Sequence, residues 1–99
     1  ARQKRVTTGA LNKFVAEITA AHPPVSPGHR HVRIMYAAQT GVAPPSFVFF
    51  TNVATTFHFS YQRFLVNQLR EKFGFEGVPI RLHIRKRGAE RPSERKDKR

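Results

Sequence analysis

The sequence predicts a small α+β domain in which two helices pack on one face of a three-stranded sheet. Two stretches carry apolar residues at the helical spacing i, i+3, i+4, i+7, and three shorter stretches have strand-like apolar patterns. Along the 99 residues their order is helix, strand, strand, helix, strand. Each helix has one apolar stripe and two of the strands have one apolar face, so placing both helices on the same face of the sheet buries these surfaces together.

The first helix is predicted over Thr8–Ala21. Its apolar stripe consists of Leu11, Phe14, Val15 and Ile18. Thr7 or Thr8 can cap its start, because a threonine hydroxyl accepts a hydrogen bond from an unpaired amide of the first turn. The pair Pro23-Pro24 ends it, since a residue that precedes proline is pushed out of helical geometry.

Two strands are expected between the helices. The first alternates with period two, its apolar side formed by Val32, Ile34 and Tyr36 and its other side by His31, Arg33 and Met35. A loop over Ala38–Pro45 then leads to Phe47–Phe50, which is apolar on both sides and is therefore central or next to a partner surface. Because the connection is short, the two strands are expected to pair antiparallel.

The second helix is predicted to follow Ser60 as its N-cap, with Phe59 packed on Phe64 across the first turn. Its inner stripe consists of Tyr61, Phe64, Leu65, Leu69 and Phe73. Gly74 stands where a left-handed residue ends a helix. In the third strand, Ile80, Leu82 and Ile84 alternate with Arg81, His83 and Arg85.

The charge of the chain is concentrated in the part that is expected to fold. Lys and Arg number 18 against 6 Asp and Glu, a net charge of +12. Residues 1–6 are predicted to be a basic disordered lead and residues 88–99 a disordered basic tail, because both are poor in apolar residues. Residues 7–87 form the domain. A basic folded unit attracts polyanions through counterion release, and RNA is the usual partner.

Several classes of function are excluded or disfavoured by composition. The absence of cysteine excludes disulfides, thiol catalysis and zinc–thiolate sites. No apolar run approaches the roughly 20 residues of a membrane helix, no signal peptide is recognised, and we expect a cytoplasmic protein. His29-x-His31 lacks a third metal ligand, no phosphate-binding loop is present, and no carboxylates pair as acid and base. We therefore expect no catalytic residue, metal, cofactor or small-molecule substrate in this chain.

Two basic surfaces are candidate interaction sites. The first is the sheet face turned away from the helices, which would carry His31, Arg33, Arg81, His83 and Arg85. Such a face can bind RNA phosphates, pack on a protein domain, or contact only water. The second is a basic surface formed by Arg63, Arg70, Lys72, Lys86 and Arg87. A helix face of this kind is commonly just solvated.

Six motifs follow one another between residues 7 and 87. They are Thr8-x-x-Leu11-Asn12, His22-Pro23-Pro24, Ile34-x-Tyr36-Ala37-x-Gln39, Pro44-Pro45-x-Phe47-Val48-x-Phe50, Phe59-Ser60-Tyr61-x-Arg63-Phe64-Leu65, and Phe73-Gly74-Phe75-Glu76-Gly77-Val78-Pro79-Ile80-Arg81. In this order and spacing the chain resembles the C-terminal KH-like domain of the tandem-domain GTPases of the Der (EngA) family. The resemblance implies a KH-like α-β-β-α-β fold.

The resemblance also implies a function for the protein of which such a domain is a part. That protein would be a bacterial or organellar GTPase that uses GTP and Mg and acts in assembly of the large ribosomal subunit. Two GTPase domains would precede this one, so the chain alone would not be an enzyme. Its expected partners are rRNA or the 50S precursor, contacted through the basic surfaces. The alternative is an intramolecular module that packs on the GTPase domains and regulates them without binding RNA.

The stretch Gly74-Phe75-Glu76-Gly77 has the letters of the G-x-x-G loop with which KH domains grip nucleic acid. Pro79 and a strand follow it where a second helix would be needed, and the Glu76 carboxylate would repel phosphate. We therefore expect a structural turn in which Phe75 packs back against the helix.

Overall fold

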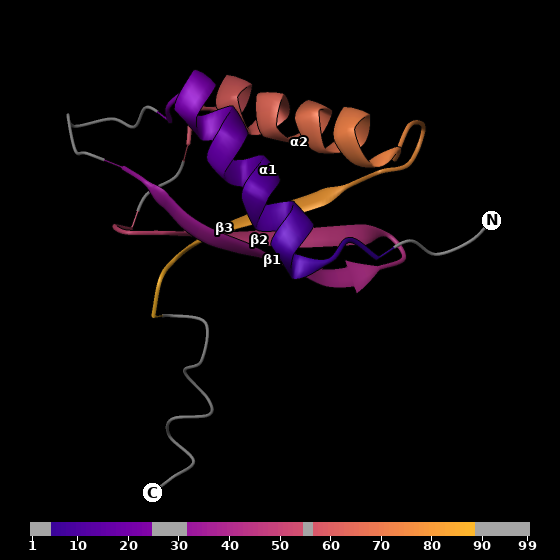
Figure 1. Cartoon of the computed structure of the whole chain (residues 1–99), viewed down its shortest axis with the longest axis horizontal. Coiled ribbons are helices and arrows are strands. Elements are labelled where there is room, and N and C mark those ends of the chain that lie inside the picture. The colour runs from indigo at the N-terminus through magenta and orange to yellow at the C-terminus, as the bar shows by residue number, and fades with distance from the viewer. Residues whose placement is uncertain (1–4, 25–31, 55–56, 89–99) are drawn as a thin grey trace, which may run out of the picture.

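The computed structural model describes residues 5–24, 32–54 and 57–88. In these ranges the elements are α1 (Thr8–Ala21), β1 (Ile34–Val42), β2 (Pro45–Thr51), α2 (Phe59–Phe73) and β3 (Arg81–Lys86). Both helices lie over the same face of the sheet (Figure 1). The predicted α+β class, the order of elements and the two-layer arrangement are therefore confirmed.

The sheet has the order β1-β2-β3, with β1 antiparallel and β3 parallel to β2. The central position predicted for Phe47–Phe50 is confirmed. Phe47 pairs with Gln39 and Leu82, and Phe49 pairs with Ala37 and Ile84, which forms two rows of side chains that face the helices. Both phenylalanines are fully buried. They form the floor of the core.

The helices contribute the other half of the core. Residues from α1, α2 and the adjoining segments pack against this floor: Val6, Leu11, Phe14, Val15, Val32, Phe57, Leu65, Leu69 and Phe75. Phe14 of α1 meets Phe73 of α2 edge to face, with ring centroids 5.4 Å apart. Val6, placed in the lead by the sequence, belongs to the packed part, and its amide donates to Gln39 Oε1 at 2.7 Å.

Two helix ends follow the predictions. The Thr7 hydroxyl accepts a hydrogen bond from the amide of Ala10 at 3.2 Å and so caps α1. Gly74 ends α2 with φ 77° and ψ 36°, the left-handed conformation that costs glycine least. The amides of Gly74 and Phe75 both donate to the carbonyl of Arg70 at 3.0 Å. The chain is thereby turned back toward the core.

The predicted start of the second helix is wrong by two residues. Its N-cap is His58, whose Nδ1 accepts a hydrogen bond from the amide of Ser60 at 3.1 Å, so Ser60 lies inside the first turn. Phe59 is 67% exposed, and the ring contacts of Phe64 are with His22 and Tyr61. Phe57 takes the expected role instead, because it is buried and its ring meets Tyr61 at 5.3 Å. Moving the start of the helix rotates Phe59 to the outside.

The predicted loop over Ala38–Pro45 is also wrong. β1 continues to Val42, β2 begins at Pro45, and the two are joined by a tight turn at Ala43 and Pro44, whose peptide bond is cis. Proline is tolerated as the first residue of a strand, and Gly41 lies within β1 opposite Ser46. Gly41, Pro44 and Pro45 are of residue types that commonly indicate a loop, but in this structure they belong to a β-hairpin.

The predicted placement of Tyr36 on the inner side of β1 is wrong as well. Ile34 pairs with Thr51 and packs against the core, but a register shift follows, and Tyr36 pairs with Phe50. Since an extra residue reverses the alternation of side chains, Ala37 faces the helices and Tyr36 faces away from them. A β-bulge at Met35 thus exchanges the two sides of the strand.

The side chain of Asn12 joins α1 to the outer edge of β1. Its Oδ1 accepts a hydrogen bond from the amide of Ala37 at 2.8 Å, and its Nδ2 donates to the carbonyl of Ala37 at 3.0 Å. Nδ2 also donates to the carbonyl of Thr8. The amide group therefore takes the place of a neighbouring strand at one position of the sheet edge.

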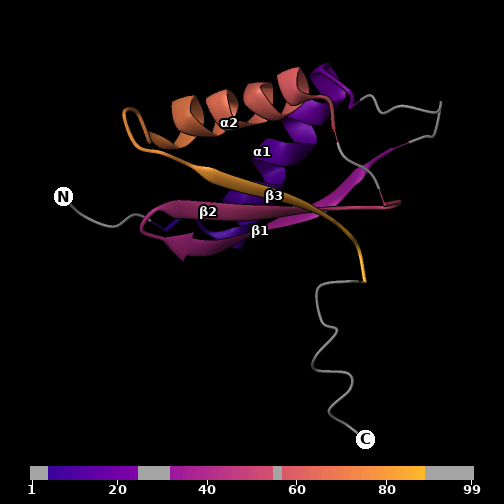
Figure 2. The same cartoon turned by 180° about the vertical axis from the view of Figure 1, so that it is seen from behind.

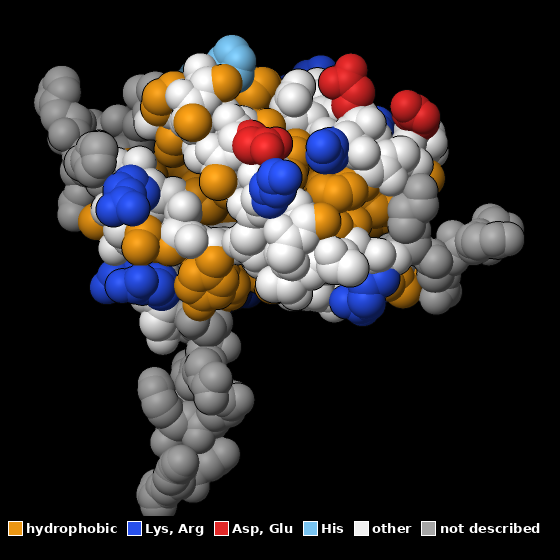
Figure 3. Space-filling model, in the orientation of Figure 1, with side chains coloured by type: hydrophobic (Ala, Val, Ile, Leu, Met, Phe, Trp, Pro, Cys, Tyr) orange, Lys and Arg blue, Asp and Glu red, His pale blue; other side chains and the backbone are white. Residues whose placement is uncertain are grey.

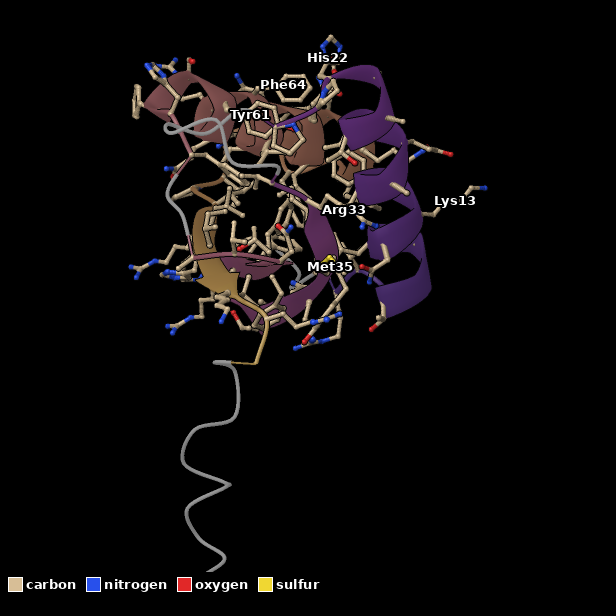
Figure 4. All side chains as sticks on the ribbon, turned by 90° about the vertical axis from the view of Figure 1, so that its left-hand side faces the viewer. Lys13, His22, Arg33, Met35, Tyr61 and Phe64 are labelled. Atoms are coloured by element: carbon tan, nitrogen blue, oxygen red, sulfur yellow. The ribbon has the colours of Figure 1, made fainter. Side chains whose placement is uncertain are left out.

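Tyr61 links α2 to the end of α1. Its hydroxyl donates to the carbonyl of His22 at 2.7 Å, and the His22 ring meets Phe64 edge to face at 4.9 Å. The three side chains gather where the two helices approach each other (Figure 4). Burial raises the pKa of Tyr61 to about 12, because a phenolate is poorly solvated there.

Asn12→Ala is expected to destabilise the domain by about 1–3 kcal/mol, since it leaves the amide and carbonyl of Ala37 without partners. Urea denaturation followed by circular dichroism measures the change. Lys13→Ala is the matched control, because this neighbouring side chain points away from the sheet into solvent (Figure 4). Equal stability of the two variants would contradict the role of Asn12.

Tyr61→Phe is expected to lower stability near neutral pH and to remove part of the alkaline sensitivity of the protein. The raised pKa of Tyr61 means that its neutral form contributes stability below the unfolded pKa of 10.0, and this contribution is lost as pH rises toward about 12. The stability difference between wild type and variant should therefore shrink between about pH 10 and about pH 12 in paired urea titrations. A constant difference would show that Tyr61 ionises alike in both states.

Candidate functional site

The face of the sheet turned away from the helices is the candidate site, and we call it the open sheet face. Its residues come from all three strands and from the residue before β1: Arg33, Tyr36, Ala38, Val48, Phe50, Arg81, His83 and Arg85. Two straight rows cross it. One is Tyr36–Phe50–Arg85, and the next is Ala38–Val48–His83.

The centre of the open sheet face is apolar. Val48 and Phe50 are 6% and 5% exposed, yet neither belongs to the core under the helices. The Tyr36 ring stacks on Phe50 with centroids 4.7 Å apart and planes 30° apart. The aromatic pair is therefore a separate packed feature on the side of the sheet that the described helices do not cover.

Basic side chains border this apolar centre. Arg81, His83 and Arg85 are exposed and alternate with the half-buried Leu82 and Ile84, which point to the helices. Their alternation follows from the period of a strand with one buried face. β3 lies at the edge of the sheet beneath α2 (Figure 2). The strand thus presents a row of positive groups along one side of the face.

No carboxylate balances this charge on the described strands. The acidic residues of the described ranges are Glu17 on α1, Glu71 on α2 and Glu76 in the turn that follows. In the view of Figure 3, acidic atoms lie over the helical part, whereas basic atoms also lie along the lower margin, on the side of the sheet. The described carboxylates thus lie on the helices and in the turn after α2, whereas the charged residues of the described strands are all basic.

Arg33 is fixed at one end of the open sheet face. It lies between Val32 and Ile34, which both pack toward the core, so its own exposed side chain leaves the strand on the opposite side. Asn52 holds this segment, because its Oδ1 accepts from the amide of Arg33 at 2.8 Å and its amide donates to the Arg33 carbonyl at 3.1 Å. His31, the fifth residue predicted for this face, lies outside the described residues.

The second predicted basic surface is divided among three places. Arg63 lies over the exposed ring of Phe59 at 5.6 Å, in a groove of about 350 Å³ between α2 and β3. Lys72 lines a hollow of about 300 Å³ between α1 and α2, together with Glu17 and Glu71. Lys86 and Arg87 are exposed at the end of β3.

The Arg70 side chain makes hydrogen bonds within the domain. Its Nη2 donates to the carbonyl of Val78 at 3.0 Å, and its Nη1 donates to Asn67 Oδ1 at 3.3 Å. The guanidinium thus ties α2 to the segment that leads into β3. Of the five residues, Arg63 and Arg70 line the same groove, whereas Lys72 lines the hollow between α1 and α2, and Lys86 and Arg87 lie at the end of β3.

The segment Gly74-Phe75-Glu76-Gly77 forms a turn that leads into β3 without a second helix. Phe75 is buried, and its ring meets Phe47 of β2 edge to face at 6.0 Å, whereas the sequence predicted a contact with the helix. Gly77 has φ 76°, and the amide of Val78 donates to the carbonyl of Phe75 at 3.2 Å. The turn serves to place an aromatic side chain in the core.

Within the described ranges, no three His, Asp or Glu side chains come close enough together to hold a metal ion. His29, considered as a ligand with His31, lies with it outside those ranges. Among the helices that the structure describes, none combines the length and the apolar character needed to span a bilayer.

Comparison with known sequences identifies the family. Residues 5–85 match the family described as the KH-domain-like C-terminal region of EngA bacterial GTPase enzymes. The chain belongs to this family. It is 56% identical over 91 residues to GTPase Der of Moorella thermoacetica, which covers 92% of the chain and 20% of the relative. It is 49% identical over 84 residues to GTPase Der of Desulforamulus reducens, covering 85% and 19%.

A further relative shows the same limits of the match. GTPase Der of Symbiobacterium thermophilum is 48% identical over 92 residues, covering 93% of the chain and 20% of the relative. The chain therefore spans about a fifth of the length of these curated relatives. It corresponds to their C-terminal KH-like domain, and the GTPase domains lie outside the matched region. The predicted family and the absence of a GTPase domain from the match are confirmed.

The sequence did not indicate Tyr36 as part of the candidate site. Its spacing from Ile34 predicted an inward position, and nothing local to residues 34–36 signals the bulge. The pairing of Tyr36 with Phe50 depends on the register of two strands, which the alternation within one strand does not contain.

Arg70→Ala is expected to lower stability by about 1–2 kcal/mol, because the Val78 carbonyl loses a charged donor. Arg63→Ala, which removes the same type of side chain two turns earlier on the same side of α2, should change stability by less than about 0.5 kcal/mol, because Arg63 lies over the exposed Phe59 ring. Thermal unfolding of both variants measures the contrast. If the two variants unfold together, the assignment of Arg70 as an anchor of the turn is incorrect.

Proposed function

We propose that this KH-like domain contacts ribosomal RNA of a large-subunit precursor through the open sheet face. The observation that carries the proposal is the row Arg81, His83 and Arg85 on a sheet whose described strands hold no carboxylate. Arg33 extends the positive charge to the far edge of the same face. The described acidic residues lie on the helices and in the turn after α2. Because none of them lies on the strands, the open sheet face attracts a polyanion.

The chemistry of these side chains suits a phosphate backbone. A guanidinium donates two parallel hydrogen bonds to the oxygens of one phosphate. Arg81 and Arg85 are four residues apart on one strand and are thus about 13 Å apart, which lets them reach different phosphates. Binding of this kind releases counterions, so its affinity depends steeply on salt.

The names of the relatives support a role for the whole protein as a GTPase. Curated proteins that share this domain are named GTPase Der and come from bacteria. In such a protein GTP and Mg would be bound by the domains that precede this one, and the KH-like domain would dock the GTPase on the pre-ribosome in the cytoplasm. The domain would contribute binding, and the GTPase domains would contribute hydrolysis.

A second candidate function is packing on the GTPase domains of the same protein. The apolar centre formed by Val48, Phe50 and Tyr36 favours it, because such a surface fits a protein neighbour as well as a nucleic acid. The partner would be a domain that the present chain does not contain. A shape-fitted interface of this kind would be much less sensitive to salt than phosphate binding.

The double variant Arg81→Glu/Arg85→Glu is expected to lower affinity for transcribed large-subunit rRNA fragments about ten- to 100-fold. The slope of log affinity against log salt should become less steep, by the amount that corresponds to the loss of about two phosphate contacts. Fluorescence titrations at about 50 and about 200 mM salt measure both quantities. Lys13→Glu/Lys72→Glu is the matched control, because it changes the net charge equally on exposed helix positions.

The control should lose less than about threefold in affinity, an estimate that assumes only long-range charge effects. Equal losses in both double variants would mean that total charge, and not the open sheet face, governs binding. Unchanged RNA affinity, together with salt-resistant binding to the separate GTPase domains, would favour the second candidate.

A further inference from the structure

We propose that an extended acidic peptide adds to the outer edge of β3 as an additional strand and places apolar side chains in the groove between β3 and α2. The partner is a protein segment in which apolar and acidic residues alternate. This surface lies at the edge of the sheet, and its use does not depend on RNA binding at the open sheet face.

The backbone of β3 presents hydrogen-bonding groups at the edge of the sheet. The Arg87 amide donates to the Thr51 carbonyl of β2 at 2.7 Å, and the Thr51 hydroxyl donates to the Arg85 carbonyl at 3.2 Å, so these groups face β2. Because the facing side alternates from residue to residue along a strand, the amides and carbonyls of Leu82 and Ile84 face the opposite side. Among the described strands, none pairs with that side of β3. An incoming strand therefore meets a row of donors and acceptors.

An apolar groove lies beside this edge. It measures about 350 Å³ and is lined by Phe59 and Val66 of α2 and by Ile80 and Leu82, and α2 runs along it above β3 (Figure 2). Leu82 is only half-buried, whereas Phe47, its paired residue on the central strand, is fully buried. The apolar row of β3 is thus incompletely covered. Side chains of an added strand that point to the helices would complete its cover.

The charges around the groove favour an acidic occupant. Arg63 and Arg70 line the groove, and none of the described carboxylates does. On an added strand every second side chain would point to the open sheet face, next to the exposed Arg81 and Arg85. Acidic residues at those positions form favourable cross-strand pairs with the arginines. The segment that fits is therefore apolar toward α2 and acidic toward the open sheet face.

A second copy of this domain fits the edge poorly. Antiparallel pairing of two β3 strands would place Arg81, His83 and Arg85 of one copy against the same basic residues of the other. Like charges directly opposite each other destabilise a pair of strands. An acidic segment reverses the sign of this interaction along the same row, so the charge of β3 distinguishes the two occupants.

The first test measures binding of the 99-residue chain to a synthetic peptide of about eight residues in which valine and glutamate alternate. Two further peptides carry N-methyl groups, one on the valines and the other on the glutamates. Only alternate amides of an added strand face β3, so one methylated peptide should lose at least about tenfold in affinity and the other should stay within about threefold. Fluorescence anisotropy measures the affinities. Equal affinities of the two methylated peptides would overturn strand addition.

Amide hydrogen exchange of the wild-type chain tests the same geometry without any variant. When the parent peptide saturates the domain, exchange of the Leu82 and Ile84 amides should slow by at least about tenfold more than that of the His83 and Arg85 amides, which already face β2. Protection that does not alternate along β3 is incompatible with an added strand.

A pair of charge variants on α2 tests the groove. Arg63→Glu should weaken binding of the parent peptide about tenfold, because it places a carboxylate in the groove. Lys72→Glu is the matched control, since it makes the same charge change in the hollow between α1 and α2, and it should lose less than about threefold. Equal losses would mean that net charge alone attracts the peptide. If the peptide does not bind and single-stranded RNA loses affinity in Arg63→Glu alone, the groove is a nucleic-acid site and the peptide proposal fails.

Discussion

β2 carries apolar side chains on both of its faces, and the rest of the domain is arranged to cover them. The side chains of Phe47 and Phe49 point toward the helices and are fully buried, whereas Val48 and Phe50 lie on the opposite face of the sheet. Burying one such aromatic side chain contributes about 2–3 kcal/mol. The strand must therefore occupy the middle of the sheet, with β1 and β3 beside it and the two helices above it.

The elements that the sequence predicts well are those whose signal is repeated along the chain. Four apolar residues at helical spacing define α1, and its bounds agree with the structure. β3 alternates apolar and basic residues without interruption, so Arg81, His83 and Arg85 could be assigned to one face in advance. In both elements each residue supports the same periodic pattern, so one irregular position would not change the assignment.

The features that could not be predicted depend on one residue or on a partner strand. The bulge at Met35 adds one residue to β1, and this is enough to transfer Tyr36 from the core side to the open sheet face. The start of α2 depends on whether the imidazole of His58 or the hydroxyl of Ser60 accepts the first amide. Arg70 resembles the other basic residues of α2 in sequence, and only the position of the Val78 carbonyl shows that its charge is used internally.

The contact between Asn12 and Ala37 has a consequence for association between copies of the domain. An unpaired strand edge is a template on which a second sheet can grow. On β1, Asn12 occupies the amide and the carbonyl of Ala37, so a foreign strand cannot complete its ladder there. A second copy that paired along the edge of β1 would therefore lose its ladder bonds at Ala37, and this interruption disfavours growth of the sheet through β1.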